Sequence, residues 1–191
     1  MPVNLPNILT VSRIALIPAF ALIYGLTDSL YWLAALLFAL AATTDWLDGY
    51  LARRLGQTTP FGTFLDPVAD KLIVVTALVV LIGSHASLWL TIPGAIIVGR
   101  EIVVSALREW MAEMNRRGLV AVSWTGKVKT LLQMIAIAVL LANPPQLDRP
   151  WVIVGLVLCY AAAFMTLWSM AVYLRVAWPI LSDAFARRSE T

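Results

Sequence analysis

Four aspartates draw attention because they form two pairs inside strongly apolar stretches. Asp45 and Asp48 are three residues apart, and Asp66 and Asp70 are four residues apart. Side chains at these spacings share one face of a helix, and a carboxylate inside a bilayer helix is costly. If the two helices meet, the four carboxylates repel one another unless cations neutralise them. All-oxygen ligation suits Mg²⁺, Mn²⁺ or Ca²⁺, whereas zinc favours Cys and His ligands.

The residues around the aspartates favour a phosphorylated ligand. Gly49 and Ala52 are small, so a flat or extended group could approach the backbone there, although small residues also serve close helix packing. Arg53 follows Gly49 by one helical turn and can hold a phosphate. Gly62 is placed in the turn that joins the two helices. We therefore expect a site for a phosphorylated ligand on two metal ions.

The composition places these residues in a membrane. Of the 191 residues, 61% are hydrophobic and 13% charged, against about 45–50% and 25% in soluble domains. This excludes a disordered chain, a disulfide mini-protein and an ordinary soluble enzyme. A membrane-spanning helix needs about 20 residues. We expect an all-α integral membrane protein, a six-transmembrane-helix bundle that is one domain over residues 1–191, with spans Leu9–Gly25, Tyr31–Leu51, Pro67–Ile82, Leu88–Leu107, Val128–Leu141 and Trp151–Val176.

The basic residues predict the orientation. Arg149 is the one Lys or Arg in the connections Leu26–Leu30, Gly83–Ser87 and Asn143–Pro150, and the other 13 of the 14 lie toward the opposite side. An excess of Lys and Arg marks the cytoplasmic side, so both termini are predicted to be cytoplasmic. The same side holds the connections Gly56–Leu65 and Asn115–Thr125. The basic charge is explained by membrane side, and it does not indicate nucleic acid binding.

The spacing of these residues resembles the signature of the CDP-alcohol phosphatidyltransferases. The chain matches it at Asp45, Asp48, Gly49, Ala52, Arg53, Gly62, Asp66 and Asp70. The resemblance implies six transmembrane helices, a homodimer, and two divalent ions, Mg²⁺ or Mn²⁺, at the cytoplasmic side. It also implies that the four aspartates are metal ligands and that Asp70 is in addition the catalytic base. Enzymes of this family transfer a phosphatidyl or similar group from a CDP-linked donor to an alcohol and release CMP.

Five longer segments resemble the bacterial members that use glycerol 3-phosphate, and the resemblance covers nearly the whole chain. They are Asn4–Arg13, Thr44–Arg54, Phe64–Lys71, Arg100–Glu109 and Val122–Thr130. This resemblance implies that the 1-hydroxyl of sn-glycerol 3-phosphate attacks CDP-diacylglycerol, giving phosphatidylglycerophosphate and CMP. It implies phospholipid biosynthesis in the bacterial cytoplasmic (inner) membrane, among membrane lipids, with the active site facing the cytoplasm.

An acceptor that carries a phosphate requires a second anion site. Arg100 lies too deep in the fourth span for a lipid-facing role, and Arg108 and Lys127 lie nearer the cytoplasm. We expect these three side chains to bind the acceptor phosphate. Glu101 and Glu109 are expected to orient basic groups through ion pairs. A solvated or headgroup-facing role is at least as good an interpretation for Lys129, Arg116 and Arg117.

The CDP-lipid is expected to contact Gly49, Ala52 and Arg53, and the first helix contributes two further candidates. Asn7 and Thr10 could help to hold the CDP group, or they could serve as helix cap and interface residues.

Two alternative functions stay open. One is a sibling transferase that uses another alcohol, such as inositol phosphate or serine. The other is a cation or proton transporter that uses buried carboxylates. A single intramembrane aspartate could serve as a proton relay, or it could simply pair with Arg13 or Lys71. Transporters often show internal repeats and broken helices, and here both aspartate pairs lie on one side of the membrane instead of lining a path across it.

Overall fold

Six helices account for nearly all of the chain that the structure, a computed structural model, describes. It describes residues 5–55, 59–114 and 124–188, with the backbone alone at 5–6, 45–53, 55, 63, 124–125, 127, 176–177 and 179–188. The helices are α1 (Leu5–Leu26), α2 (Tyr31–Leu55), α3 (Pro60–His85), α4 (Leu88–Glu113), α5 (Trp124–Leu141) and α6 (Pro150–Arg188). The expected all-α class is therefore confirmed for the described residues.

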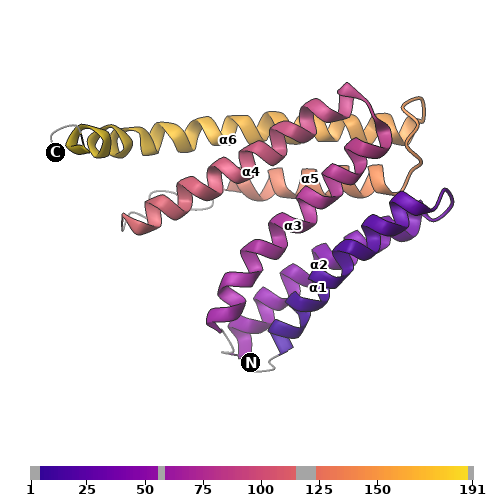
Figure 1. The fold of residues 1–191 in the computed structure, drawn as a ribbon, viewed down its shortest axis with the longest axis horizontal. Coiled ribbons are helices and arrows are strands. Elements are labelled where there is room, and N and C mark those ends of the chain that lie inside the picture. Colours follow the sequence, from indigo (N-terminus) through magenta and orange to yellow (C-terminus); the bar gives the residue numbers. More distant parts are fainter. Residues whose placement is uncertain (1–4, 56–58, 115–123, 189–191) are drawn as a thin grey trace.

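The helices form two arms that diverge from a common end (Figure 1). α1 and α2 lie in one arm, and α4, α5 and α6 lie in the other. α3 contacts α1 and α2 as well as α4 and α5, so it joins the two arms. The connections that follow α1, α3 and α5 gather near the common end, and the first turn of α1 and the last turn of α6 lie away from it.

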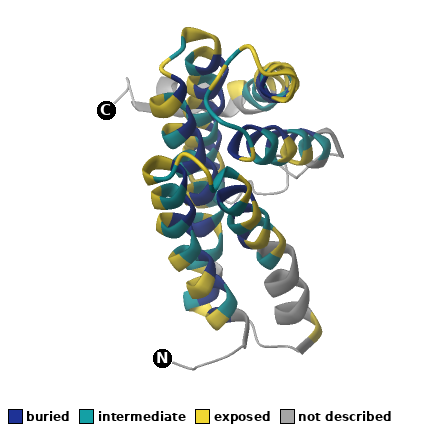
Figure 2. Cartoon of the chain, turned by 90° about the vertical axis from the view of Figure 1, so that its right-hand side faces the viewer, coloured by how far each residue is buried: buried dark blue, intermediate teal, exposed yellow. Residues whose placement is uncertain are grey.

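The apolar core runs through the bundle, and large apolar side chains also cover its outside. Phe20 and Phe38 meet edge to face with their ring centroids 5.8 Å apart, and they belong to the same buried cluster as Leu78. On the outside, Phe164 is 69% exposed and Trp168 is 66% exposed. Figure 2 shows this contrast, with buried faces turned inward and exposed faces outward. Outward apolar surface on helices suits a lipid environment, because lipid requires no polar face.

Three of the described helices are long and apolar enough to cross a membrane. They are Asn7–Leu26, Leu88–Glu113 and Pro150–Arg175, and shorter apolar helices lie at Tyr31–Thr44 and Val128–Leu141. The structure thus supports an integral membrane protein built of helices. The six-span count and the cytoplasmic termini stay predictions.

The third helix begins earlier than expected, and the prediction of a connection over Gly56–Leu65 is wrong for its second half. Thr59 is the N-cap, and its Oγ1 accepts a hydrogen bond from the N–H of Gly62 at 3.0 Å. Pro60 occupies the first helical turn, where a missing N–H costs nothing. The helix then continues through Pro67. Gly62 therefore lies in the first turn of α3 and not in the connection, and Asp66 lies inside the helix.

The far end of α3 is also longer than expected. The connection predicted over Gly83–Ser87 shrinks because the helix continues to His85. Ala86 ends it in the left-handed conformation (φ 44°), and its N–H bonds to the carbonyl of Ile82 at 3.0 Å. Ser87 then caps α4, since its Oγ accepts from the N–H of Trp89 at 3.3 Å.

Candidate active site

The two aspartates of α3 are held by side chains of α1. Thr10 Oγ1 donates to Asp66 Oδ1 at 2.9 Å, and Arg13 Nη1 pairs with Asp70 Oδ1 at 2.6 Å. The Arg13 side chain is fully buried, whereas the Asp70 side chain is 46% exposed. A buried guanidinium needs a counter-ion, so this pair fixes both the arginine and the carboxylate. α1 thereby sets the position of two carboxylates that lie one turn apart on α3.

Gly62 permits the close approach of α1 to the start of α3. A Cβ at this position would lie 2.9 Å from Asn7 Oδ1 and 3.3 Å from Thr59 Oγ1. Asn7 Oδ1 in turn accepts a hydrogen bond from Thr59 Oγ1 at 3.1 Å. Asn7 and Thr10 thus bond to side chains of α3 or of its N-cap. Any larger residue at position 62 would push this contact apart.

The other half of the expected metal site lies outside the described side chains. The backbone of Asp45, Asp48, Gly49, Ala52 and Arg53 is helical and belongs to α2. α2 contacts both α1 and α3, so the helix that carries the first aspartate pair packs beside the helix that carries the second. Among the described side chains, no group of three or more Asp, Glu, His or Cys residues gathers.

A cavity of about 340 Å³ lies between α3 and the second arm. We call it the α3–α6 cavity. Pockets of roughly 300–1,000 Å³ are typical of small-ligand sites. Its polar lining comes from four helices and comprises Asp70, Lys71, Arg100, Glu101, Ser105, Arg108, Lys129, Thr130, Gln133 and Tyr173. The cavity therefore brings a carboxylate of the expected metal site together with the basic residues of α4 and α5.

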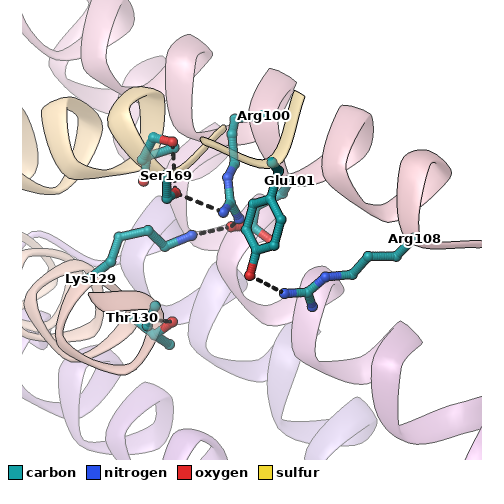
Figure 3. A network of polar contacts seen from close by, with 9 residues as sticks. Arg100, Glu101, Arg108, Lys129, Thr130 and Ser169 are labelled. Carbon is teal, nitrogen blue, oxygen red and sulfur yellow. Dashed lines mark hydrogen bonds and ion pairs between the residues drawn. The ribbon is translucent and has the colours of Figure 1, made fainter. Parts of the chain in front are cut away.

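Glu101 is the centre of an ionic network in this cavity (Figure 3). Its Oε1 accepts from Lys129 Nζ at 2.7 Å and from Arg100 Nη1 at 3.1 Å. Arg100 Nη2 also donates to Ser169 Oγ at 2.9 Å, and Ser169 Oγ donates to the carbonyl of Thr166. The side chains of Arg100 and Lys129 are 7% and 4% exposed. One glutamate thus compensates two buried cations.

Arg108 lies nearer the end of α4 and is exposed. Its Nη2 donates to Tyr173 Oη at 3.1 Å, and its Cζ lies 5.4 Å from the centroid of the same ring. The tyrosine on α6 therefore holds the guanidinium both by a hydrogen bond and by a cation–π contact. Glu101, Ser105 and Arg108 lie at helical spacing along α4, and all three line the α3–α6 cavity.

Known proteins match this chain along most of its length. The sequence profile of the CDP-alcohol phosphatidyltransferase family matches residues 3–173. The chain belongs to this family. A protein of Pseudomonas fluorescens is 56% identical over 181 residues, which cover 93% of this chain and 92% of the relative. Proteins of Shigella flexneri and Escherichia coli are 51% and 50% identical over 187 residues, 96% of this chain and 100% of each relative. All three are named CDP-diacylglycerol–glycerol-3-phosphate 3-phosphatidyltransferase.

For a CDP-alcohol phosphatidyltransferase, the structure places the expected acceptor residues as follows. Arg100 and Arg108 both line the α3–α6 cavity, and the side chain of Lys127 lies outside the described residues. Lys129 is buried and paired with Glu101. Of the two roles left open for Lys129, the solvated or headgroup-facing one is therefore wrong. Arg116 and Arg117 lie outside the described residues.

Sequence reasoning missed several side chains that shape this site. Arg13 was considered as a partner of a lone aspartate and not as part of the site, although an arginine inside an apolar run is itself a signal. Ser169 and Tyr173 on α6 gave no signal, because a serine and a tyrosine are common in membrane helices. Gln133 is a buried polar residue one turn after Lys129, and this spacing on an apolar helix could have revealed it.

Proposed function

We propose that this protein is a CDP-diacylglycerol–glycerol-3-phosphate 3-phosphatidyltransferase. It transfers the phosphatidyl group of CDP-diacylglycerol to the 1-hydroxyl of sn-glycerol 3-phosphate, and the products are phosphatidylglycerophosphate and CMP. The observation that carries this proposal is the α3–α6 cavity, where Asp70 shares one space with Arg100, Arg108 and Lys129. The identity of the substrates is supported by the names of relatives that are 50–56% identical over nearly the whole chain.

The aspartates fit a pair of divalent cations, Mg²⁺ or Mn²⁺. Asp66 and Asp70 offer carboxylate oxygens on one face of α3, and these are the ligands that such cations prefer. Thr10 and Arg13 orient them, as outer partners orient metal ligands generally. Asp45 and Asp48 on α2 are the proposed remaining ligands. When bound, the cations would neutralise the pyrophosphate and stabilise the negative charge that develops on CMP.

Asp70 is the proposed base for the transfer. The 1-oxygen of glycerol 3-phosphate forms a bond to the β-phosphorus of CDP-diacylglycerol. The bond from that phosphorus to the oxygen bridging to the α-phosphate breaks, and CMP leaves with the electron pair. The hydroxyl proton passes to the Asp70 carboxylate. Because Asp70 is half-exposed and lines the α3–α6 cavity, an acceptor in that cavity can reach it, and direct transfer needs no covalent enzyme intermediate.

The two substrates are proposed to occupy opposite sides of Asp70. The CDP group is assigned to Gly49, Ala52 and Arg53 of α2, with Asn7 and Thr10 of α1 at its edge. The acceptor phosphate is assigned to Arg100, Arg108 and Lys127, and the buried Lys129 adds positive charge to the same region. This arrangement requires the acceptor to enter between α3 and the second arm, where the cavity lies.

The whole chain, residues 1–191, is proposed to be a single membrane domain in the bacterial inner membrane. The placement of 13 of the 14 Lys and Arg on one side supports cytoplasmic termini and a site that opens to the cytoplasm. The orientation can be tested by fusing a reporter enzyme that is active on only one side of the membrane to either terminus and measuring its activity. A homodimer is proposed from the family resemblance, and light scattering of the purified protein in detergent would test it.

CMP release by the purified protein tests the activity directly. CDP-diacylglycerol and Mg²⁺ or Mn²⁺ are supplied with glycerol 3-phosphate, inositol phosphate, serine or no acceptor. Release with glycerol 3-phosphate alone, and its loss with EDTA, is the expected result. Release with a different acceptor would overturn the acceptor while keeping the family chemistry. No release from folded protein with any acceptor would overturn the transferase function and favour the transporter.

A further inference from the structure

Gln133 is a buried amide in the α3–α6 cavity that the reaction described above does not use. Its side chain is 3% exposed, and it lines the cavity together with Asp70 and Arg100. Its Oε1 is fully buried and has no hydrogen-bond partner among the described residues. A buried polar group without a partner is costly, so packing alone does not account for an amide at a position where an apolar residue would pack as well.

Two cations that line the same cavity as Gln133 already donate hydrogen bonds within the protein. Lys129 lies one turn before Gln133 on α5 and donates to Glu101 at 2.7 Å. Arg100 donates to Glu101 at 3.1 Å and to Ser169 at 2.9 Å. Both cations therefore donate to acceptors of the protein, and Arg100 Nε alone among their buried nitrogens has no partner in the described part of the chain. The hydrogen bond that Gln133 lacks is therefore best supplied by the molecule that occupies the cavity.

The chemistry of an amide selects a neutral hydroxyl as that partner. The carbonyl oxygen of Gln133 would repel a phosphate, and the phosphate is better served by Arg100, Arg108 and Lys129. A hydroxyl both donates and accepts, and so does a carboxamide. The pairing therefore holds whichever way the amide is turned.

We propose that Gln133 binds the secondary hydroxyl, at C2, of the glycerol 3-phosphate acceptor and so selects this acceptor. The inference rests on the proposed function and deepens it. In the acceptor, C2 lies between the 1-hydroxyl, which must reach Asp70, and the phosphate, which is held by the basic residues. Gln133 lines the same cavity as both groups. A hydrogen bond at C2 orients the 1-hydroxyl for attack and disfavours acceptors that lack a hydroxyl there.

The test pairs one change in the protein with one change in the acceptor. Glycerol 3-phosphate is compared with 3-hydroxypropyl phosphate, which has the same chain and primary hydroxyl but no hydroxyl at C2. CMP release gives kcat/KM for both acceptors with the wild type, with Gln133→Met, and with the control Gln146→Met. Methionine keeps the length of the side chain and removes the amide. Gln146 is exposed and lies in the connection before α6, where it bonds to Arg149.

The wild type and Gln146→Met are expected to favour glycerol 3-phosphate by about tenfold, the size of one neutral hydrogen bond. Gln133→Met is expected to lose this preference and to retain wild-type kcat/KM with 3-hydroxypropyl phosphate. An unchanged preference in Gln133→Met would overturn the proposal. Equal use of both acceptors by the wild type would also overturn it, and this result needs no folded variant. A wild type that releases no CMP with glycerol 3-phosphate would instead overturn the function on which the inference rests.

Discussion

Glu101 is the counter-ion of two buried cations, and its neutralisation gives the sharpest test of the network in the cavity. Its Oε1 lies 2.7 Å from Lys129 Nζ and 3.1 Å from Arg100 Nη1. Glu101→Gln keeps the shape of the side chain and removes its charge. The two cations, which are 4% and 7% exposed, would then face each other without compensation. We expect this variant to fold and to be markedly less stable.

The size of the loss follows from these distances. With an effective dielectric constant of about 20, the gross attraction is about 6 kcal/mol at 2.7 Å and about 5 kcal/mol at 3.1 Å. Desolvation of the three groups offsets most of it, and removing one partner of a buried pair typically costs about 3–5 kcal/mol. At roughly 2–4 °C per kcal/mol for a chain of this size, Tm should fall by about 6–20 °C.

Thermal unfolding of the purified protein in detergent measures this loss. Glu109→Gln on the same helix is the matched control, because Glu109 is exposed and its change should shift stability by less than about 0.5 kcal/mol. Lys129→Met removes one of the two cations. The double variant Glu101→Gln/Lys129→Met should therefore lose less than the sum of the single losses. Additive losses, or a wild-type Tm for Glu101→Gln, would refute the electrostatic reasoning.

Three further outcomes are expected. Asp70→Asn should retain CDP-lipid binding and lower the rate of CMP release by about 10²–10⁴-fold, the usual contribution of a general base; near-normal release would remove Asp70 from that role. Arg100→Ala should raise KM for glycerol 3-phosphate about tenfold or more, as expected when a charged hydrogen bond is lost, and should leave KM for CDP-diacylglycerol nearly unchanged. Equal effects on both would mark a structural arginine. Burial lowers the pKa of His85, at the end of α3, below its ordinary value of 6.5. The unfolded chain then binds the proton first, so stability is fully present above pH 6.5 and is lost as the pH falls toward the lower folded pKa. His85→Phe should flatten Tm between pH 7.5 and 5.5, and a slope equal to that of the wild type would contradict this assignment.

The apolar runs and the helix-breaking residues between them were sufficient to place most helices, because lipid-facing helices must be apolar along their length. α4 begins at Leu88 and α2 at Tyr31, as predicted. The start of α3 was misplaced because its first turns are not an uninterrupted apolar run. The signal there was local, a threonine cap at Thr59 followed by Pro60, and a hydropathy pattern carries no information about caps.

The sequence did not predict the contacts that hold the candidate site residues in place. The spacing of the aspartates predicted a metal site, because charge in a lipid-facing chain is rare. It did not identify Arg13 as the group that holds Asp70, since this contact joins positions 57 apart. The contact of Arg100 with Ser169 joins positions 69 apart. Such pairs depend on which helices pack together, and a single sequence contains no direct record of that packing.

The contacts divide the helices into those that present reactive groups and those that orient them. α3 presents Asp66 and Asp70, and α1 holds both through Thr10 and Arg13. α4 presents Arg100 and Arg108, and α6 holds both through Ser169 and Tyr173. Each side of the cavity therefore has its own supporting helix, and the two sets of contacts share no residue.

This separation has a consequence for how the site responds to change. A variant that weakens the contacts of α1 with α3 should displace the two carboxylates. A variant that weakens the contacts of α6 with α4 should displace Arg100 and Arg108. Because residues without shared partners contribute nearly additively, losses in the two sets should add in stability. In kinetic measurements, variants of the two sets should affect different substrates. The α1 contacts lie on the side assigned to CDP-diacylglycerol, and the α6 contacts lie on the side assigned to glycerol 3-phosphate. Under the proposed assignment, each anionic substrate thus has its own supporting helix, α1 beside the carboxylates on the CDP-diacylglycerol side and α6 beside the cations on the glycerol 3-phosphate side.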